Sequence, residues 1–175
     1  PASKMHPAKT SPSELAAIVF TSGSTGKPKG VRYLHSTFNA QVESLRENFG
    51  MSEGELDLTT LPVFALFNPA LGITSVIPDM NPRKPAKADP EKLVRAIMDF
   101  KISSAFASPV IGKKIANWCL EKNQDLPSLK RIFLAGAPSP PSLIEKLSRI
   151  LINGQVIVPY GSTEALPVAY CKSQE

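Results

Sequence analysis

The chain has 175 residues and a net charge of +5, with 42% hydrophobic and 20% charged residues, a balance typical of a globular protein with a core and not of a disordered chain. The positive charges are mixed with acids and only 7% of the residues are aromatic. This pattern favours a solvated basic surface and argues against a nucleic-acid partner.

Local features argue against three further classes of protein. Cys119 and Cys171 lack Cys-x-x-Cys spacing and a neighbouring histidine, so a zinc site is not expected. Isolated thiols are typical of a reducing compartment, and we therefore expect a cytoplasmic protein. Residues 1–13 are polar and resemble no signal peptide. The uncharged run from Leu58 to Pro78 is interrupted by prolines, so we expect it in a protein core and not in a membrane span.

Strands and helices are predicted to alternate after a linker or leading segment at residues 1–13. The apolar run at residues 15–20 suits a strand buried on both faces of a parallel sheet, and a Ser/Thr/Gly-rich loop follows it. Gly50 closes the first predicted helix, and Asp89 and Pro90 begin a later one as N-cap and first helical residue. The predicted helices span residues 35–49, 90–100, 109–121 and 141–151, with residues 63–72 as a further candidate, and the predicted strands span residues 15–20, 56–61, 73–77, 102–107, 131–135 and 155–158, before a final loop that begins at Gly161.

This alternation predicts an α/β fold with a mostly parallel sheet and helices on both faces. In such folds ligands bind beyond the carboxyl ends of the strands. Loops of interest follow three predicted strands, after Phe20, Ala135 and Val158. Motif and topology therefore indicate the same edge of the sheet.

The loop from Thr21 to Gly30 has the composition of a polyphosphate-binding site. Its glycines allow tight turns that bring backbone N–H groups close to a ligand. It is not a Walker A loop, because Pro28 follows Gly26 and Lys27. A disordered linker has a similar composition, but the position between a buried strand and a helix favours phosphate binding. The hydroxyls and cations of this loop belong to Thr21, Ser22, Ser24, Thr25, Lys27 and Lys29.

Three motifs, in this order, resemble one known family. Residues 20–30 (Phe-Thr-Ser-Gly-Ser-Thr-Gly-Lys-Pro-Lys-Gly) match the signature of the AMP-forming adenylating superfamily, which includes acyl-CoA synthetases, luciferases and peptide-synthetase adenylation domains. Residues 136–138 (Gly-Ala-Pro) resemble its adenine-contacting loop, and residues 160–164 (Tyr-Gly-Ser-Thr-Glu) resemble its Tyr-Gly-x-Thr-Glu motif. The resemblance covers essentially the whole chain.

The resemblance implies a role for each matching residue. The loop after Phe20 would hold the β- and γ-phosphates of ATP, Tyr160 would lie against the adenine, Thr163 would hydrogen-bond the α-phosphate, and Glu164 would help to hold Mg²⁺. Outside such a motif, Tyr160 would more simply be a half-buried core residue and Glu164 a surface acid. The implied catalytic residues are Thr163 and Glu164, Glu164 is also the implied metal ligand, and the implied nucleotide-binding residues are Thr21, Ser22, Gly23, Ser24, Thr25, Gly26, Lys29, Gly136, Ala137, Pro138, Tyr160 and Gly161.

Residues 61–72 and 160–167 are most similar to one branch, the β-lactone synthetases of bacterial long-chain olefin biosynthesis. This similarity implies adenylation of a long-chain β-hydroxy fatty acid, after which the substrate's own hydroxyl displaces AMP. Residues 61–78 are expected to line or abut the acyl site. Ala65 stands where many acyl-CoA synthetases have a histidine, which would suit an internal attack, and Val158 stands where an asparagine is usual. The alternatives are a fatty-acyl-CoA synthetase, which uses CoA, and a non-catalytic nucleotide-binding domain.

The resemblance also implies that residues 14–175 form part of the large N-terminal domain of an adenylate-forming enzyme. In the family, the ribose-binding aspartate, the hinge and the small C-terminal domain with a catalytic lysine all lie beyond the last of these motifs. We therefore expect an N-terminal portion and a C-terminal domain outside this chain. Residues 1–175 alone are expected to be inactive, and ATP and a carboxylic acid are the expected partners of the full-length protein.

Overall fold

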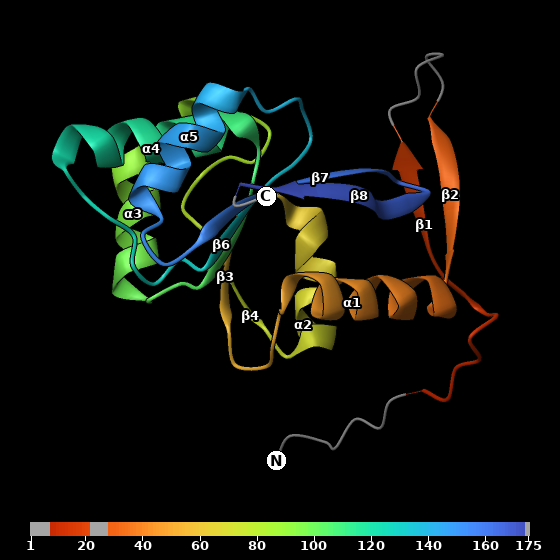
Figure 1. The fold of residues 1–175 in the computed structure, drawn as a ribbon. Coiled ribbons are helices and arrows are strands. Elements are labelled where there is room, and N and C mark those ends of the chain that lie inside the picture. The colour runs from red at the N-terminus through yellow and green to blue at the C-terminus, as the bar shows by residue number, and fades with distance from the viewer. Residues whose placement is uncertain (1–7, 22–27, 174–175) are drawn as a thin grey trace.

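The computed structural model describes residues 8–21 and 28–173, except for the side chains of residues 63 and 64. The described residues form a two-stranded sheet and a six-stranded sheet of order β4-β3-β5-β6-β7-β8 (Figure 1). The strands are β1 (Leu15–Thr21), β2 (Lys29–Leu34), β3 (Leu56–Thr59), β4 (Thr74–Val76), β5 (Ser104–Ala107), β6 (Arg131–Leu134), β7 (Gln155–Ser162) and β8 (Ala165–Lys172). The helices are α1 (His35–Phe49), α2 (Asn68–Leu71), α3 (Pro90–Asp99), α4 (Pro109–Lys122) and α5 (Pro141–Ile150), with 3₁₀ turns η1 (Pro62–Leu66) and η2 (Pro85–Lys87).

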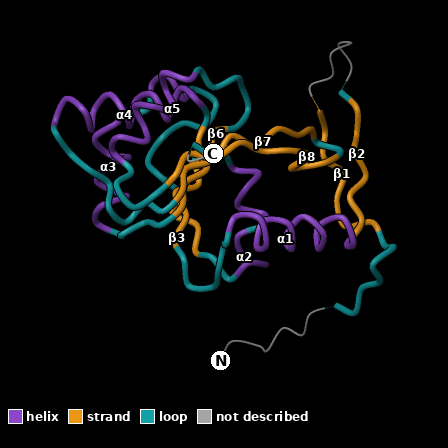
Figure 2. The backbone as a smooth tube through the Cα atoms, viewed as in Figure 1, coloured by secondary structure: helices purple, strands orange, loops and turns teal. Residues whose placement is uncertain are grey.

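The six-stranded sheet is mostly parallel, as predicted. Strands β3 to β7 pair in parallel, and β8 is added antiparallel at the edge. Figure 2 shows α3, α4 and α5 on one side of the strands and α1 and α2 on the other. The predicted α/β class with helices on both faces is therefore confirmed. Within the described part of the chain, none of the helices is both long enough and apolar enough to cross a membrane.

The central strands are buried on both faces because their side chains alternate between two cores. One core, under α3, α4 and α5, receives Ala105, Ala107, Ile132, Leu134 and Val156. The other core, under α1 and α2, receives Phe106, Phe133 and Ile157. Apolar residues are therefore favoured at every position of these strands, which is why their sequences read as short uninterrupted apolar runs.

Local signals set the end of α1 and the start of α3 where the sequence predicted them. Gly50 adopts a left-handed conformation (φ 60°), and its N–H donates to the carbonyl of Arg46 at 3.0 Å, which closes α1. The Asp89 carboxylate accepts from the Glu91 N–H at 2.9 Å, and Pro90 is the first residue of α3. The predicted boundaries of α1 and the start of α3 are confirmed.

One strand prediction and one loop prediction were wrong. Residues 15–20 do not join the parallel sheet. They form β1, which pairs antiparallel with β2, and Ile18 and Phe20 are 50% and 69% exposed. An apolar run cannot by itself distinguish a central parallel strand from one strand of a hairpin. The final loop expected from Gly161 is instead the end of β7, a turn at residues 163–164 and strand β8.

Two buried acids, Glu55 just before β3 and Asp57 within it, have pKa values shifted in opposite directions. Burial alone would raise the pKa of Glu55, but the charge and hydrogen bond of Arg131, with hydrogen bonds from Ser52 and Ser103, hold it below its ordinary value. Burial raises the pKa of Asp57, which accepts from Thr59 Oγ1 at 2.5 Å and Asn68 Nδ2 at 3.2 Å. Ionised Glu55 therefore stabilises the fold, whereas ionised Asp57 costs free energy.

We predict opposite effects for neutral replacements of these two acids. Glu55→Gln leaves the Arg131 guanidinium buried without a counter-charge and should lower the free energy of unfolding by about 3–5 kcal/mol. Asp57→Asn removes a buried charge, keeps an acceptor for Thr59 and Asn68, and should change the free energy of unfolding by less than about 1 kcal/mol. Urea unfolding of the full-length variants at neutral pH measures both.

The pH dependence supplies a control. Because the folded-state pKa of Glu55 is lowered, its contribution to stability is present above the unfolded value near 4.5 and is lost as the pH falls below it. The raised pKa of Asp57 has the opposite effect on stability. The folded state binds this proton more tightly than the unfolded state does, so the stability rises as the pH falls. Glu55→Gln should therefore lose less stability than the wild type on acidification. An equally steep acid loss would contradict the assignment.

Candidate functional site

Two of the predicted site motifs follow neighbouring parallel strands. Residues 136–138 come directly after β6, and residues 160–164 form the end of β7 and the turn into β8. Gly136 has φ 88°, a left-handed conformation that favours glycine, and Gly136, Ala137 and Pro138 are all exposed. Because β6 and β7 are neighbouring parallel strands, both motifs lie on the carboxyl-end side of these strands.

The turn between β7 and β8 presents the second motif to the outside. The side chain of Tyr160 is 73% exposed, so the interpretation as a half-buried core tyrosine is wrong. Gly161 lies at an irregularity in the β7–β8 register, where an added Cβ would come within 2.8 Å of the Ala165 carbonyl. Glycine is thus required there for the strands to approach. Thr163 is half-buried and Glu164 is exposed at the turn.

The phosphate-loop candidate is the connection of the β1–β2 hairpin. Thr21 and Lys29 face each other at its base, and Thr21 Oγ1 donates to the Lys29 carbonyl at 3.5 Å. The structure therefore places both ends of the loop. The predicted residues Ser22, Gly23, Ser24, Thr25 and Gly26 lie outside the described residues.

Electrostatics link this hairpin to the β7–β8 turn. The pKa of Glu164 is lowered, first by a hydrogen bond from its own backbone N–H, then by Ser162, and further by the positive charge of Lys29. Glu164 is therefore an ionised, exposed carboxylate within reach of the field of Lys29.

A hydrogen-bond chain supports the same turn from beneath. The hydroxyl of Tyr33, on β2, donates to the backbone carbonyl of Thr163 and accepts from Gln41 Nε2 of α1 at 3.5 Å. The Tyr33 ring is 6% exposed and packs edge-on against Phe38, with ring centroids 5.1 Å apart. Sequence reasoning missed Tyr33, although Val31 and Tyr33 alternate with Gly30 and Arg32, which is a short period-two strand signal.

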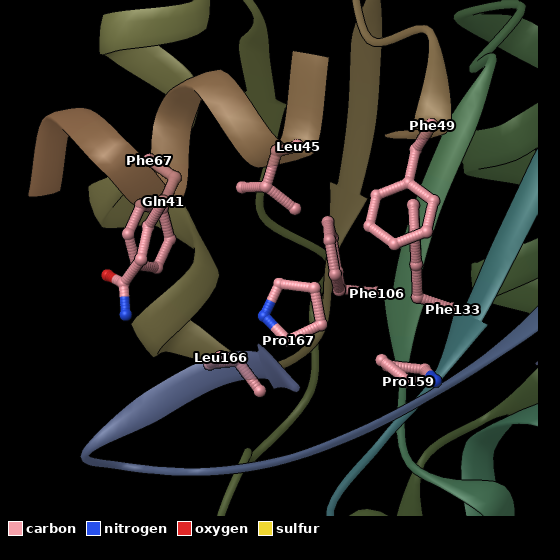
Figure 3. Close-up of a pocket in the computed structure, with 9 residues that line it drawn as sticks. All are labelled: Gln41, Leu45, Phe49, Phe67, Phe106, Phe133, Pro159, Leu166 and Pro167. Atoms are coloured by element: carbon pink, nitrogen blue, oxygen red, sulfur yellow. The ribbon is translucent and has the colours of Figure 1, made fainter. Parts of the chain in front are cut away.

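A narrow apolar pocket lies beneath the β7–β8 hairpin, between α1 and the sheet (Figure 3). Phe106 and Phe133 stack in its wall with centroids 4.2 Å apart, and Phe49 meets Phe133 edge-on at 5.0 Å. Sequence reasoning did not assemble this pocket, because its residues come from separate segments. They are Gln41, Leu45, Phe49, Phe67, Phe106, Phe133, Pro159, Leu166 and Pro167.

The site therefore combines a small apolar pocket with the half-buried Thr163 and the exposed carboxylate of Glu164, while Lys29 lies on the β1–β2 hairpin. This combination suits a ligand that has an apolar part and an anionic part. Among the described residues there is no group of three or more His, Cys, Asp or Glu side chains placed to hold a metal ion. Glu164 alone offers carboxylate oxygens, which suits a hard cation that takes most of its ligands from phosphate and water.

Comparisons of this chain with a family model and with known proteins agree on one family. A family model described as AMP-binding enzyme matches residues 1–175. The chain is 49% identical over 163 residues to an olefin beta-lactone synthetase of Xanthomonas campestris pv. campestris, covering 93% of this chain and 29% of that protein. It is 47% identical over 169 residues to the olefin beta-lactone synthetase of Stenotrophomonas maltophilia, covering 96% of this chain and 30% of that protein. The chain thus spans about three tenths of the length of these relatives.

A solved structure supports the fold. The crystal structure of a long-chain-fatty-acid-CoA ligase from Archaeoglobus fulgidus aligns with a TM-score of 0.74 at 25% identity, over 89% of this chain and 33% of that one.

The Tyr33 contact generates a testable prediction about the β7–β8 turn. Tyr33→Phe removes the hydroxyl that holds the Thr163 carbonyl, so amide hydrogen exchange in residues 160–166 should become about 2- to 10-fold faster. Tyr170→Phe is the matched control, because its hydroxyl meets only an exposed Asn48 at 3.4 Å. Equal effects of the two variants on the 160–166 peptides, read by mass spectrometry, would contradict a special role for Tyr33.

Proposed function

The chain belongs to the AMP-binding enzyme family, and from this premise we propose that the full-length protein adenylates a long-chain β-hydroxy fatty acid with ATP and converts the adenylate to a β-lactone. The observation that carries the proposal is the 47–49% identity to two olefin beta-lactone synthetases over at least 93% of the chain. A β-lactone ring joins the carboxyl carbon to the oxygen on the β-carbon, so a substrate for such a product carries a β-hydroxyl. The family match bears out the resemblance seen in the three motifs.

The exposed edge of the sheet is the proposed nucleotide site. The loop between Thr21 and Lys29 is proposed to hold the β- and γ-phosphates, and residues 136–138 to contact the adenine. Tyr160 is proposed to stack on the adenine, and its 73% exposure leaves a ring face available for that contact. Gly161 permits the close strand approach that keeps Tyr160 and Thr163 in place.

The β7–β8 turn is proposed to act on the phosphates directly. The Thr163 hydroxyl would donate to the α-phosphate, and Lys29 would offset negative charge on the departing phosphates. The ionised carboxylate of Glu164 fits a Mg²⁺ ligand, as its lowered pKa indicates. When bound with the nucleotide, Mg²⁺ would neutralise charge on the phosphate oxygens.

The proposed reaction has two steps. In the first, a carboxylate oxygen of the fatty acid attacks the α-phosphorus, the bond from that phosphorus to the bridging oxygen breaks, and pyrophosphate leaves. In the second, the β-hydroxyl oxygen attacks the acyl carbon, the bond between that carbon and the AMP oxygen breaks, and AMP leaves with the electron pair. The hydroxyl proton passes to solvent. Because the nucleophile is part of the substrate, its effective concentration is high.

The apolar pocket beneath the β7–β8 hairpin has an accessible volume of about 10 Å³, so it is proposed to abut the acyl site and not to hold a whole acyl chain. It abuts the turn that carries Thr163, and aromatic side chains form much of its wall. Phe67, which lines this pocket, comes from the run expected to line or abut the acyl site. Ala65 does not line this pocket, so the idea that an alanine there favours the internal attack gains no support from it.

A fatty-acyl-CoA synthetase is the second candidate, favoured by the structural similarity to the archaeal long-chain-fatty-acid-CoA ligase. The two candidates share the first step and differ in the second nucleophile. The higher identity to the beta-lactone synthetases favours the lactone reaction. CoA would be a substrate only in the second candidate. A cytoplasmic location agrees with the free state of both cysteines and is part of the proposal.

Neutralising Glu164 should impair the first step. In the full-length protein, Glu164→Gln or Thr163→Ala should lower the rate of ATP–pyrophosphate exchange by about 10- to 100-fold, because each removes a contact to a charged phosphate or its cation. Glu145→Gln, an equal charge change on the exposed surface of α5, is the control. Wild-type exchange rates in both turn variants would reject the site. Absence of exchange in the wild type with any carboxylic acid would favour a non-catalytic nucleotide-binding domain.

The second step separates the two enzyme candidates. The full-length protein is given ATP, Mg²⁺ and a long-chain β-hydroxy acid, with and without CoA. We expect a β-lactone and AMP in both reactions, detected by mass spectrometry of the lipid extract. Strict dependence on CoA with a thioester product would reject the lactone reaction in favour of the synthetase.

A further inference from the structure

A layer of four polar side chains, Asp57, Asn68, Ser75 and Ser104, lies between the six-stranded sheet and α2. In the strand register, Asp57 of β3 lies beside Ser75 of β4 on one side and Ser104 of β5 on the other. Asn68, the first residue of α2, donates its Nδ2 to Asp57 Oδ2 at 3.2 Å and to Ser75 Oγ at 2.8 Å. Asp57, Asn68 and Ser104 are each at most 1% exposed, so the centre of this polar layer is closed to solvent.

The polar layer has more hydrogen-bond acceptors than donors. Among the described residues, Asp57 Oδ1, Asn68 Oδ1 and Ser104 Oγ have no hydrogen-bond partner. The amide oxygen of Asn68 and an ionised carboxylate can only accept, so the single proton of the Ser104 hydroxyl can satisfy one of them and not both. A proton on Asp57 turns its carboxyl group into a donor and supplies the second hydrogen bond. Unlike a water molecule or a metal ion, a proton needs no cavity.

The charges around the polar layer leave Asp57 without a counter-charge of its own. In the described part of the chain, the charge that acts on Asp57 is that of Arg131 on β6, and the Arg131 guanidinium is paired with Glu55. Burial therefore outweighs both this attraction and the hydrogen bonds that Asp57 accepts, and the pKa of Asp57 is raised. A buried carboxyl group avoids the cost of an unpaired charge by taking up a proton.

We propose that Asp57 is a neutral carboxylic acid in the folded protein at neutral pH and that its proton fastens α2 to the sheet. Loss of the proton would leave a charge beneath α2, and opening this four-residue helix would let water reach it. The residue before the helix, Phe67, lines the apolar pocket, so a rise in pH would loosen that wall as well. The inference concerns the fold and does not depend on the proposed function.

Infrared spectroscopy of the full-length protein in heavy water tests the protonation state directly. A protonated carboxyl group has a carbonyl stretch that a carboxylate lacks, and the difference between the wild type and Asp57→Asn at neutral pH should contain this band. Asp79→Asn is the matched control, because Asp79 is exposed and the hydrogen bond and charge of Lys92 lower its pKa. Its difference spectrum should contain carboxylate bands alone. Carboxylate bands in the Asp57 spectrum as well would overturn the proposal.

The Asp57→Asn variant is expected to fold, because an asparagine amide has the shape of the neutral acid and can donate from the same position. Thermal unfolding checks this. If the variant does not fold, Ser104→Ala replaces it, since loss of the neighbouring hydroxyl should shift the frequency of the protonated carbonyl band without removing the band. A spectrum at neutral pH in which no protonated carboxyl band responds to Ser104→Ala would contradict a neutral Asp57.

The pH dependence of local opening tests whether the proton fastens α2. Once α2 has opened, Asp57 would return to its ordinary pKa near 3.8. Opening should therefore become up to about tenfold more frequent for each pH unit above that value, until Asp57 also ionises beneath the closed helix. Amide hydrogen exchange in residues 66–73, corrected for the intrinsic exchange rate, should show this rise between about pH 5 and pH 7 in the wild type and not in Asp57→Asn. The same pH dependence in both proteins would overturn the link to α2.

Discussion

The in-register parallel pairing of β5 with β6 is the constraint on which the core and the site both depend. It places Phe106 opposite Phe133, and their rings stack with 7° between the planes. A slip of β5 by one residue would move the Phe106 ring to the face covered by α3, α4 and α5, where the core is filled by smaller aliphatic side chains. The same register ends both strands at one level, so the loops that follow them open at the same edge. Packing in the core thus sets the floor of the pocket and the position of the loops.

The candidate site is shared between the six-stranded sheet and the β1–β2 hairpin. Parallel topology explains why residues 136–138 and 160–164 lie on the carboxyl-end side of their strands, but the phosphate-loop candidate arrives on the separate β1–β2 hairpin. Two interactions join the parts: the Tyr33 hydroxyl bonds the Thr163 carbonyl, and the charge of Lys29 acts on Glu164. The first is directional and half-buried, so it can fix distance and angle. The second is exposed and falls off gradually, so it adds attraction without defining geometry.

Structural features that depend on contacts within a few residues were predicted best from the sequence. Gly50 and Asp89 end and begin helices through contacts within a few residues, and their predicted roles were correct. The apolar run of β1 was assigned to the wrong sheet because the strand with which it pairs is not determined by the run itself. Strand β8 escaped prediction because Pro167 lies inside it, and a proline is tolerated there since β8 is the edge of the sheet. Site motifs could be recognised from their residues, but the contact from Tyr33 to Thr163 spans 130 positions and leaves no local pattern.

Gln41 shows how a local exception becomes interpretable once the fold is known. In the sequence it interrupts the apolar stripe of α1 between Phe38 and Leu45, which a helical-periodicity argument treats as a minor defect. In the structure, Gln41 lines an otherwise apolar pocket, and its Nε2 donates to the Tyr33 hydroxyl at 3.5 Å. Tyr33 also holds the turn that carries Thr163. Under the proposed function, the packing of α1 and the placement of the α-phosphate therefore act on one connected set of hydrogen bonds.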